Sequence, residues 1–316
     1  MDSRSTPLLE LQNVSRIFSR KKGFLGDRQE FYAVNGVSLA LKPGETLGLV
    51  GESGSGKSTV ARMAVRLLSP SAGRVLLDGR SMFTADKAFR QSLPRRVQMV
   101  FQDPYSSLNP RLRVGYSIGE ALACAGVPAR ERKERVAALL AQVGLEKDYA
   151  ARFPHEFSGG QRQRMALARA LAPEPELVVC DEPVSSLDAS VQAQVLNLLK
   201  DNQERLGLSY LFISHDLAVI SHMSDRVAVM YAGRILETGS AADIFMNPLH
   251  PYTRELLEAS RGRGNVGSGE PGKAVASGGS GCPYLRRCGQ AGLDCAGEAP
   301  ELREIRPGHF ARCSLA

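Results

Sequence analysis

Short apolar runs alternate with longer stretches of helical periodicity along most of the chain. Residues 8–18 and 31–41 alternate between apolar and polar positions, which predicts two antiparallel strands joined by a basic loop. Further buried strands are predicted at 45–50, 97–101, 177–180 and 210–213, a hairpin at 226–231 and 234–237, and helices at 58–68, 118–125, 130–143, 161–171 and 188–206. Strands that alternate with helices in this way indicate an α/β fold with a parallel sheet at its core.

The same pattern predicts how the chain is divided. Residues 1–260 carry the strand and helix signals and form the main domain, with an inserted helical subdomain at about 102–165. Residues 261–281 are dense in Gly and Ser and nearly lack large apolar side chains, which is typical of a flexible linker. Residues 282–316 are then left as a small Cys-rich C-terminal extension.

The stretch 51–58 reads Gly-Glu-Ser-Gly-Ser-Gly-Lys-Ser and lies between a predicted strand and a predicted helix. This is the context in which such a pattern forms a phosphate-binding loop, because glycines let successive backbone N–H groups point at phosphate oxygens. Lys57 would reach the β- and γ-phosphates, and Ser58 would offer a hydroxyl to Mg²⁺. The residues expected to line this site are Gly51, Ser53, Gly54, Ser55, Gly56, Lys57, Ser58 and Thr59.

A second Gly-rich turn, Ser158-Gly159-Gly160-Gln161, opens a predicted helix far downstream. The N-terminus of a helix favours anions, so this turn is a second candidate phosphate site. Two such sites so far apart in one chain indicate that each binds a different nucleotide.

Polar side chains follow several predicted strands. Asp181 and Glu182 end the apolar run 177–180, and ligands of open α/β sheets bind at the carboxyl ends of strands. Asp181 suits the Mg²⁺ side, and Glu182 suits a general base that activates water. Gln102 ends another strand, where its amide could touch both Mg²⁺ and water, and His215 could reach the γ-phosphate.

Phe18 is a further candidate, because its ring could stack on an adenine face. A place in the core is the alternative interpretation for this residue.

The net charge and the apolar content of the chain bear on its partners and on its location in the cell. The net charge of +7 is scattered, which could favour an anionic membrane face or a polyanionic ligand but does not predict a nucleic-acid partner. The sequence shows no apolar run of about 18 residues and no secretory signal, so a location in the cytosol is expected.

Four cysteines crowd the extension, with the spacing C-x5-C-x6-C-x17-C at Cys282, Cys288, Cys295 and Cys313. Disulfides are disfavoured in a reducing cytosol. Zinc sites usually contain C-x2-C pairs, which this extension lacks, whereas four thiolates also suit a [4Fe–4S] cluster. An iron–sulfur cluster, zinc or another metal, and unligated thiols all remain open.

Taken together and in order, the loop at 51–58, Gln102, the turn 158–161, the pair 181–182, the turn Ser186-Leu187-Asp188 and His215 resemble the ATP-binding cassette (ABC) family over about residues 8–245. The resemblance implies an ABC-type P-loop NTPase fold with an antiparallel β subdomain, ATP and Mg²⁺ as cofactors, and hydrolysis with Glu182 and His215 as catalytic residues. Mg²⁺ would lie near Ser58, Gln102 and Asp181.

In that family two cassettes pack head to tail. The resemblance therefore implies that Ser158, Gly160 and Gln161 serve the nucleotide of a second subunit and that Asp188 lies beside it. The family's signature usually begins with Leu, and here Phe157 takes that place, which is a swap of one hydrophobic residue for another.

A narrower resemblance comes from the stretches 101–110 and 247–253 and from the Cys-bearing tail. These are similar to ATP-binding subunits of dipeptide and oligopeptide importers, some of which carry an iron–sulfur cluster in a comparable tail. The similarity implies a second ATPase, identical or not, two membrane permeases, an extracytoplasmic solute-binding protein and a peripheral place on the cytoplasmic face of the cell membrane.

Several other functions fit the same motifs. The cargo could be nickel, glutathione or a sugar. A soluble ABC ATPase that acts on DNA or ribosomes, an exporter or lipid-extraction ATPase, and a regulatory module that does not hydrolyse ATP are alternatives from other classes.

Overall fold

The computed structural model describes residues 6–21, 28–103, 107–261, 281–291, 295–297 and 299–313. The predicted linker at 261–281 therefore lies almost entirely outside the described residues. The chain has two compact units, one formed by residues 1–42, 46–83 and 212–316 and the other by residues 43–45 and 84–211. They are called unit 1 and unit 2 below, and each is described by itself. The domain bounds expected from the sequence stay a prediction.

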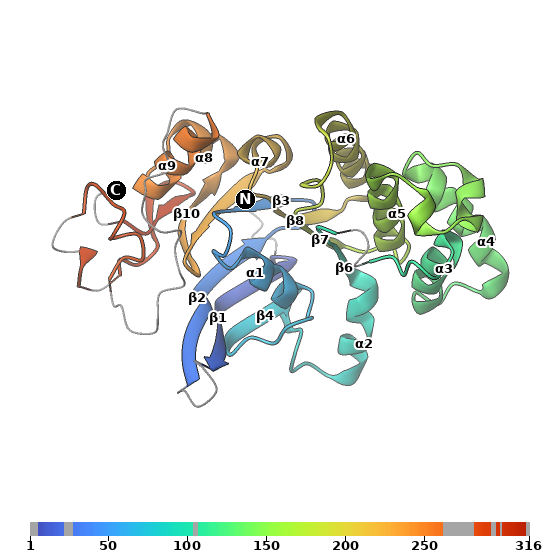
Figure 1. The fold of residues 1–316 in the computed structure, drawn as a ribbon. Helices are drawn as coiled ribbons and strands as arrows, with labels where there is room; N and C mark the ends of the chain where they lie inside the picture. The colour runs from blue at the N-terminus through green and yellow to red at the C-terminus, as the bar shows by residue number, and fades with distance from the viewer. Residues whose placement is uncertain are drawn as a thin grey trace, which may run out of the picture. The chain divides into compact units, whose positions relative to one another are not determined.

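Unit 1 contains an antiparallel sheet of four strands in the order β2-β1-β4-β5. Its strands are β1 (Leu9–Lys21), β2 (Arg28–Leu41), β4 (Ala72–Leu77) and β5 (Arg80–Ser81) (Figure 1). In the register of the sheet, Leu9 faces Leu41 on one side and Leu77 on the other, and all three side chains are buried. The two strands predicted at 8–18 and 31–41 are thus confirmed, whereas β4 and β5 were missed.

A second set of strands in unit 1 follows the order β11-β12-β10-β9-β3. These are β3 (Thr46–Val50), β9 (Arg226–Tyr231), β10 (Arg234–Ser240), β11 (Arg303–Arg306) and β12 (His309–Ala311). The β3–β9 pair is parallel, and all five residues of β3 are buried. Strand β12 pairs with β10, so the C-terminal hairpin extends this sheet (Figure 1).

The helices of unit 1 are α1 (Lys57–Ala64), α7 (Leu217–Met223), α8 (Ala241–Met246) and α9 (Pro251–Ser260). Helix α1 ends before Arg66, whose φ of 63° lies in the left-handed region. The helix predicted to run from 58 to 68 is therefore wrong at its C-terminal end.

Unit 2 contains the parallel pair β6 (Val97–Val100) and β7 (Leu177–Asp181), beside which β8 (Ser209–Ile213) begins. Its helices are α2 (Lys87–Arg96), α3 (Val114–Cys124), α4 (Ala129–Gln142), α5 (Gly159–Leu171) and α6 (Ala189–Leu206), with short 3-10 turns at Lys147–Ala151 and Pro154–Glu156. Helices α3, α4 and α5 pack against one another (Figure 1). The helices predicted at 118–125, 130–143, 161–171 and 188–206 are confirmed.

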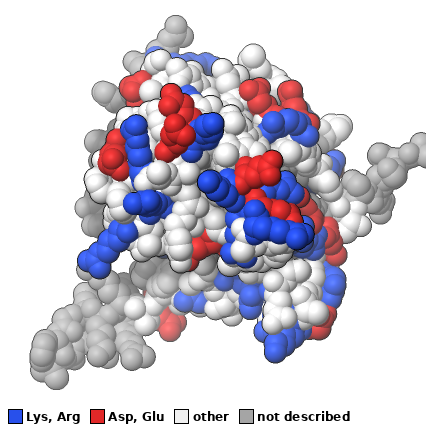
Figure 2. Space-filling view, turned by 90° about the vertical axis from the view of Figure 1, so that its right-hand side faces the viewer, with Lys and Arg blue, Asp and Glu red and all other residues white. Residues whose placement is uncertain are grey.

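No helix in the described part of the chain is both long enough and apolar enough to cross a bilayer. Charge is well mixed on the face shown in Figure 2, where Lys and Arg side chains alternate with Asp and Glu. On this face the net positive charge of the chain is not gathered into a single basic patch.

Candidate functional site

The glycine-rich loop connects β3 to α1 in unit 1, as the sequence predicts. Gly51 and Gly56 have φ values of 151° and 109°, which L side chains rarely adopt. A Cβ atom on Gly51 would lie 2.0 Å from the carbonyl oxygen of Met230, and one on Gly56 would lie 2.2 Å from that of Ala33. Glycine is therefore required at both positions, because the neighbouring strands approach the loop this closely.

The side chain of Lys57 is hydrogen-bonded to the backbone of the loop itself. Its Nζ donates hydrogen bonds to the carbonyl oxygens of Gly51 at 2.7 Å and Glu52 at 2.8 Å, and the residue is 5% exposed. Ser58 is exposed at the start of α1. A buried ammonium beside a helix N-terminus forms a positive site that suits a polyphosphate.

Two residues far along the chain support the loop from outside. The backbone N–H of Gly233, in the turn between β9 and β10, donates to the carbonyl of Ser55 at 2.9 Å. The backbone N–H of Glu52 donates to the hydroxyl of Tyr252 at 3.0 Å. Tyr252 is fully buried, and burial raises the pKa of its hydroxyl, so this group stays protonated and neutral.

Hydrogen bonds within and around the stretch 247–253 hold Tyr252 in the position from which it contacts the loop. His250 precedes α9, and its Nδ1 accepts the backbone N–H of Tyr252 at 3.0 Å, while Pro251 takes the first helical position. The buried carboxylate of Glu237 accepts the backbone N–H groups of Leu249 and His250, each at 2.8 Å. It also lies 2.7 Å from Nε2 of His309 on β12. Sequence reasoning noted the stretch only as a resemblance and missed Glu237, Tyr252 and His309.

The remaining candidates of unit 1 are Phe18 and His215. Phe18 is half-buried on β1, its ring lies 5.8 Å from that of Phe31, and the guanidinium of Arg16 lies 4.8 Å from its centroid. His215 is exposed between β8 and α7, and the neighbouring Asp216 caps α7 by accepting the N–H of Ala218.

In unit 2, strands β6 and β7 bring three candidates to one edge. Val100 pairs with Cys180, so Gln102 follows one strand, and Asp181 and Glu182 the other, at the same end of two parallel neighbours. Asp181 is 8% exposed, whereas Gln102 is exposed. Glu182 has a φ of 51°, unusual for a residue with a side chain. Such strain costs on the order of 1–3 kcal/mol and concentrates at functional sites.

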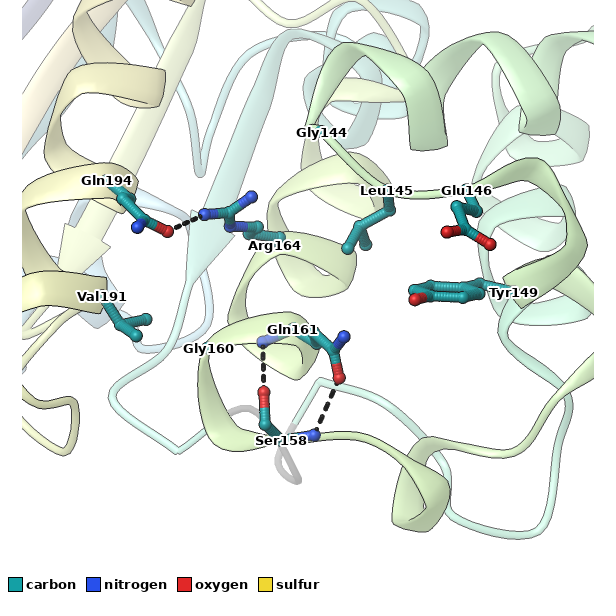
Figure 3. Close-up of a pocket in the computed structure, with 10 residues that line it drawn as sticks. All are labelled: Gly144, Leu145, Glu146, Tyr149, Ser158, Gly160, Gln161, Arg164, Val191 and Gln194. Atoms are coloured by element: carbon teal, nitrogen blue, oxygen red, sulfur yellow. Dashed lines mark hydrogen bonds between the residues drawn. The ribbon is translucent and has the colours of Figure 1, made fainter.

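The second Gly-rich turn opens α5. Ser158 is the N-cap of the helix, and its hydroxyl and backbone N–H exchange hydrogen bonds with the backbone and side chain of Gln161 (Figure 3). A Cβ atom on Gly160 would lie 2.2 Å from Cγ1 of Val191 on α6, so a side chain at this position would require the turn or Val191 to shift. Asp188 caps α6 by accepting the N–H of Val191 at 3.0 Å.

A cavity of about 300 Å³ opens beside this turn. Figure 3 shows Arg164 and Gln194 hydrogen-bonded on one side and Glu146 and Tyr149 on the other. The ring of Tyr149 also packs 4.9 Å from the buried ring of Phe157, the residue that stands where the family usually has Leu. The aromatic side chain thus fills a hydrophobic position.

The cysteines of the extension lie near one another. Burial raises the pKa of the Cys282 thiol, and the nearby thiols of Cys295, Cys313 and Cys288 raise it further. All six cysteines of the chain are within the described residues, and none forms a disulfide. Among the described residues, no group of three or more His, Cys, Asp or Glu side chains is arranged to hold a metal ion. The predicted cluster or zinc site therefore finds no support in this arrangement.

Comparison with known proteins identifies the family. An ABC transporter model matches residues 34–185, and a model of the oligopeptide/dipeptide transporter C-terminal region matches residues 236–295. The chain is 46% identical over 320 residues to the oligopeptide transport ATP-binding protein AppF of Bacillus subtilis, covering 98% of this chain and 97% of that protein. This chain belongs to the ABC transporter family. It is also 45% identical over 316 residues to a putative peptide import ATP-binding protein of Brucella ovis, with 98% of each covered.

Solved ABC structures agree with this assignment. CbiO1 of Clostridium perfringens, part of the ABC transporter complex cbiONQ, aligns with a TM-score of 0.65 and 27% identity over 77% of this chain and 92% of that one. The ATP-binding cassette MJ0796, solved as a dimer in a post-hydrolysis state with ADP and Pi, aligns with a TM-score of 0.64 and 28% identity over 74% and 98%. The fold predicted for the main part of the chain, an ABC-type P-loop NTPase, is confirmed.

Proposed function

We propose that this chain is the ATP-hydrolysing subunit of an ABC importer that takes up dipeptides and oligopeptides through separate permease subunits. The observation that carries the proposal is the pairing, in one chain, of a complete phosphate loop with a C-terminal region that matches the oligopeptide/dipeptide transporter model. Similarity over nearly the full length to proteins named for oligopeptide transport and peptide import supports the choice of cargo.

The residues present fit ATP and Mg²⁺. The glycines that permit the loop, the buried ammonium of Lys57 and the N-terminus of α1 are the groups that a triphosphate requires. When bound, Mg–ATP supplies the phosphoanhydride bond that is cleaved, and its Mg²⁺ neutralises negative charge on the phosphates. In the proposal Lys57 binds the β- and γ-phosphates, and Gly51, Ser53, Gly54, Ser55, Gly56 and Thr59 line the phosphates. The Mg²⁺ side is formed by Ser58, Gln102 and Asp181.

Glu182 is the proposed general base. It would orient the attacking water and take its proton, and His215 would hold that water near the γ-phosphate. Phe18 would stack on the adenine. The strained backbone of Glu182, at the end of a buried strand, supports a functional rather than a structural role for this side chain.

The proposed assembly is a pair of ATPase subunits. Ser158, Gly160, Gln161 and Asp188 would contact the nucleotide held by the second subunit, which can be identical or different. Two permeases and an extracytoplasmic solute-binding protein complete the importer, and the chain works on the cytoplasmic face of the cell membrane. Because each site needs two subunits, an isolated monomer should hydrolyse ATP slowly.

The cysteines of the extension have no part in this proposal. A [4Fe–4S] cluster, or zinc, at Cys282, Cys288, Cys295 and Cys313 remains a prediction from their spacing, and no step of ATP hydrolysis passes through it.

The test is ATP hydrolysis and uptake by the complete transporter in proteoliposomes. We expect Glu182→Gln to bind ATP but to lose turnover by roughly 10²- to 10⁴-fold, the usual contribution of a positioned base. Glu258→Gln, an exposed glutamate on α9, is the matched control and should behave as the wild type. Full turnover in the Glu182→Gln variant would refute the assignment of the base. Uptake of labelled nickel, glutathione or a sugar in place of di- and tripeptides would overturn the proposed cargo.

A further inference from the structure

The second residue of the phosphate loop, Glu52, is held by the far end of the chain. One nitrogen of the Arg287 guanidinium, Nη1, donates to both carboxylate oxygens of Glu52, at 2.9 Å and 3.0 Å. The other, Nη2, donates to the carboxylate of Glu255 on α9. One arginine thus joins the loop, a helix of the matched C-terminal region and the Cys-bearing segment 281–291, all within unit 1.

Arg287 is built into the fold rather than lying on the surface. Its side chain is 8% exposed, against 23% for the side chain of Glu52. Its guanidinium lies 5.9 Å from the ring centroid of Tyr231 and 5.8 Å from that of Tyr284. The hydroxyl of Tyr284 bonds to Glu255, so the surrounding side chains fix one another. A buried guanidinium held in this way has a defined position and a permanent charge.

Three polar groups of Glu52 are held by hydrogen bonds. Its N–H is bonded to Tyr252, its carbonyl accepts from Lys57, and its carboxylate is paired with Arg287. A carboxylate in a loop that binds a polyphosphate opposes the negative charge of the ligand unless a cation compensates it. Arg287 is the described cation that supplies this compensation through two hydrogen bonds.

We propose that Arg287 is a positioning residue for the phosphate loop, and that it sets the affinity for ATP by neutralising and orienting Glu52. The proposal rests on the proposed function, since it assumes that the loop binds ATP. It gives the Cys-bearing segment a direct influence on nucleotide binding, through a contact between residues 235 positions apart.

The experiment measures equilibrium binding of Mg–ATP to the full-length chain. We expect Arg287→Met to bind roughly tenfold more weakly, which is the order of effect that one uncompensated charge exerts at about 10 Å in a partly screened setting. Arg287→Lys keeps the charge and should recover most of the affinity. Arg286→Met removes an exposed arginine from the same segment and should bind as the wild type.

The double variant Glu52→Gln/Arg287→Met separates charge compensation from simple docking of the segment. If Arg287 acts by neutralising Glu52, removing both charges restores binding to within about threefold of the wild type. The loss in Arg287→Met should also shrink as salt is raised. In the assembled transporter the single variant should raise KM for ATP and leave kcat nearly unchanged.

The following results of these measurements would overturn the inference about Arg287 or the proposed function. Wild-type affinity in Arg287→Met would overturn the inference. Weak binding that the double variant fails to restore, even after Glu255→Gln removes the second carboxylate that pairs with Arg287, would show that the arginine only docks the segment, and this would overturn it too. If the wild type itself does not bind Mg–ATP, the proposed function fails, and that result is distinguishable from a failure of Arg287 alone. The melting temperature of each variant confirms that it is folded.

Discussion

His250 should make the protein lose stability as the pH falls from 7 to 5. The residue is 1% exposed and precedes α9, where its Nδ1 accepts the N–H of Tyr252 at 3.0 Å. Burial, together with the positive charge of Arg254, lowers the pKa of His250 from 6.5 to about 4. The folded protein therefore keeps this imidazole neutral at pH values where the unfolded chain has already protonated it.

The sign and size follow from linkage. A depressed pKa gives a stabilising contribution that is complete above pH 6.5 and is lost as the pH falls towards 4. Each pKa unit corresponds to about 1.4 kcal/mol, so the full loss is roughly 3 kcal/mol, and about 2 kcal/mol of it is lost by pH 5. That is a large share of the total for a domain whose free energy of unfolding is on the order of 5–15 kcal/mol.

The assay compares the wild type with His250→Asn by urea unfolding at fixed ionic strength from pH 7 to pH 5. The chain has no tryptophan, so far-UV circular dichroism follows unfolding. Asparagine can still accept the N–H of Tyr252 but does not titrate. Loss of the ring contact with Tyr284, whose centroid lies 5.7 Å away, lowers the stability of the variant by a constant amount at every pH.

The prediction concerns the difference between the two proteins. At pH 7 the wild type should be more stable than the variant, and this advantage should shrink by about 2 kcal/mol by pH 5. Other titrating groups affect both proteins equally and cancel. If the two proteins lose stability in parallel over this range, or if the His250 ring proton titrates near pH 6.5 in the folded protein, the reasoning from burial is wrong.

Two further predictions concern the signature turn and the extension. Gly160→Ala should lower ATP turnover of the assembled transporter roughly tenfold, because its Cβ would lie 2.2 Å from Cγ1 of Val191 and the turn or Val191 must shift. Gly119→Ala in α3, whose Cβ would meet nothing within 4 Å, is the matched control and should be tolerated; equal activity of the two variants would contradict the packing argument. Iron and zinc analysis after anaerobic purification tests the metal prediction from the cysteine spacing: stoichiometric metal that is lost when the four C-terminal cysteines are changed to serine would support it, and well-folded protein without either metal would end it.

The elements that the sequence predicted well are those whose signal is local. The apolar run before Gly51, the glycines of the loop and the turn at 158–161 each carry their pattern within a few residues, and the structure places them at the expected ends of strands and helices. The sequence also placed Gln102 and Asp181 at the ends of two strands, and the structure shows that these strands, β6 and β7, are parallel neighbours that end at the same edge of the sheet.

The elements that were missed lack such a signal. Helix α2 contains Pro94 and many charged side chains, so its helical periodicity is weak. Strands β11 and β12 are short, and their place is decided by pairing rather than by propensity, because β12 pairs with β10 and β11 pairs with β12. Helix α1 stops early because the chain enters the left-handed region at Arg66, and no residue type there announces the change.

The support of the phosphate loop depends on contacts between distant residues, and this is why sequence reasoning did not find it. In the sequence, Glu52 and Arg287 resemble any charged residue of a protein surface, and only the fold brings them together. The same holds for Tyr252 and Glu237, whose polar groups bond to backbone atoms of other segments. Because Tyr252 and Arg287 bond directly to Glu52 of the loop, changes at these two residues should alter nucleotide affinity in the folded protein. A region that served only to fold or to dock would instead change stability and leave the affinity of the folded protein intact.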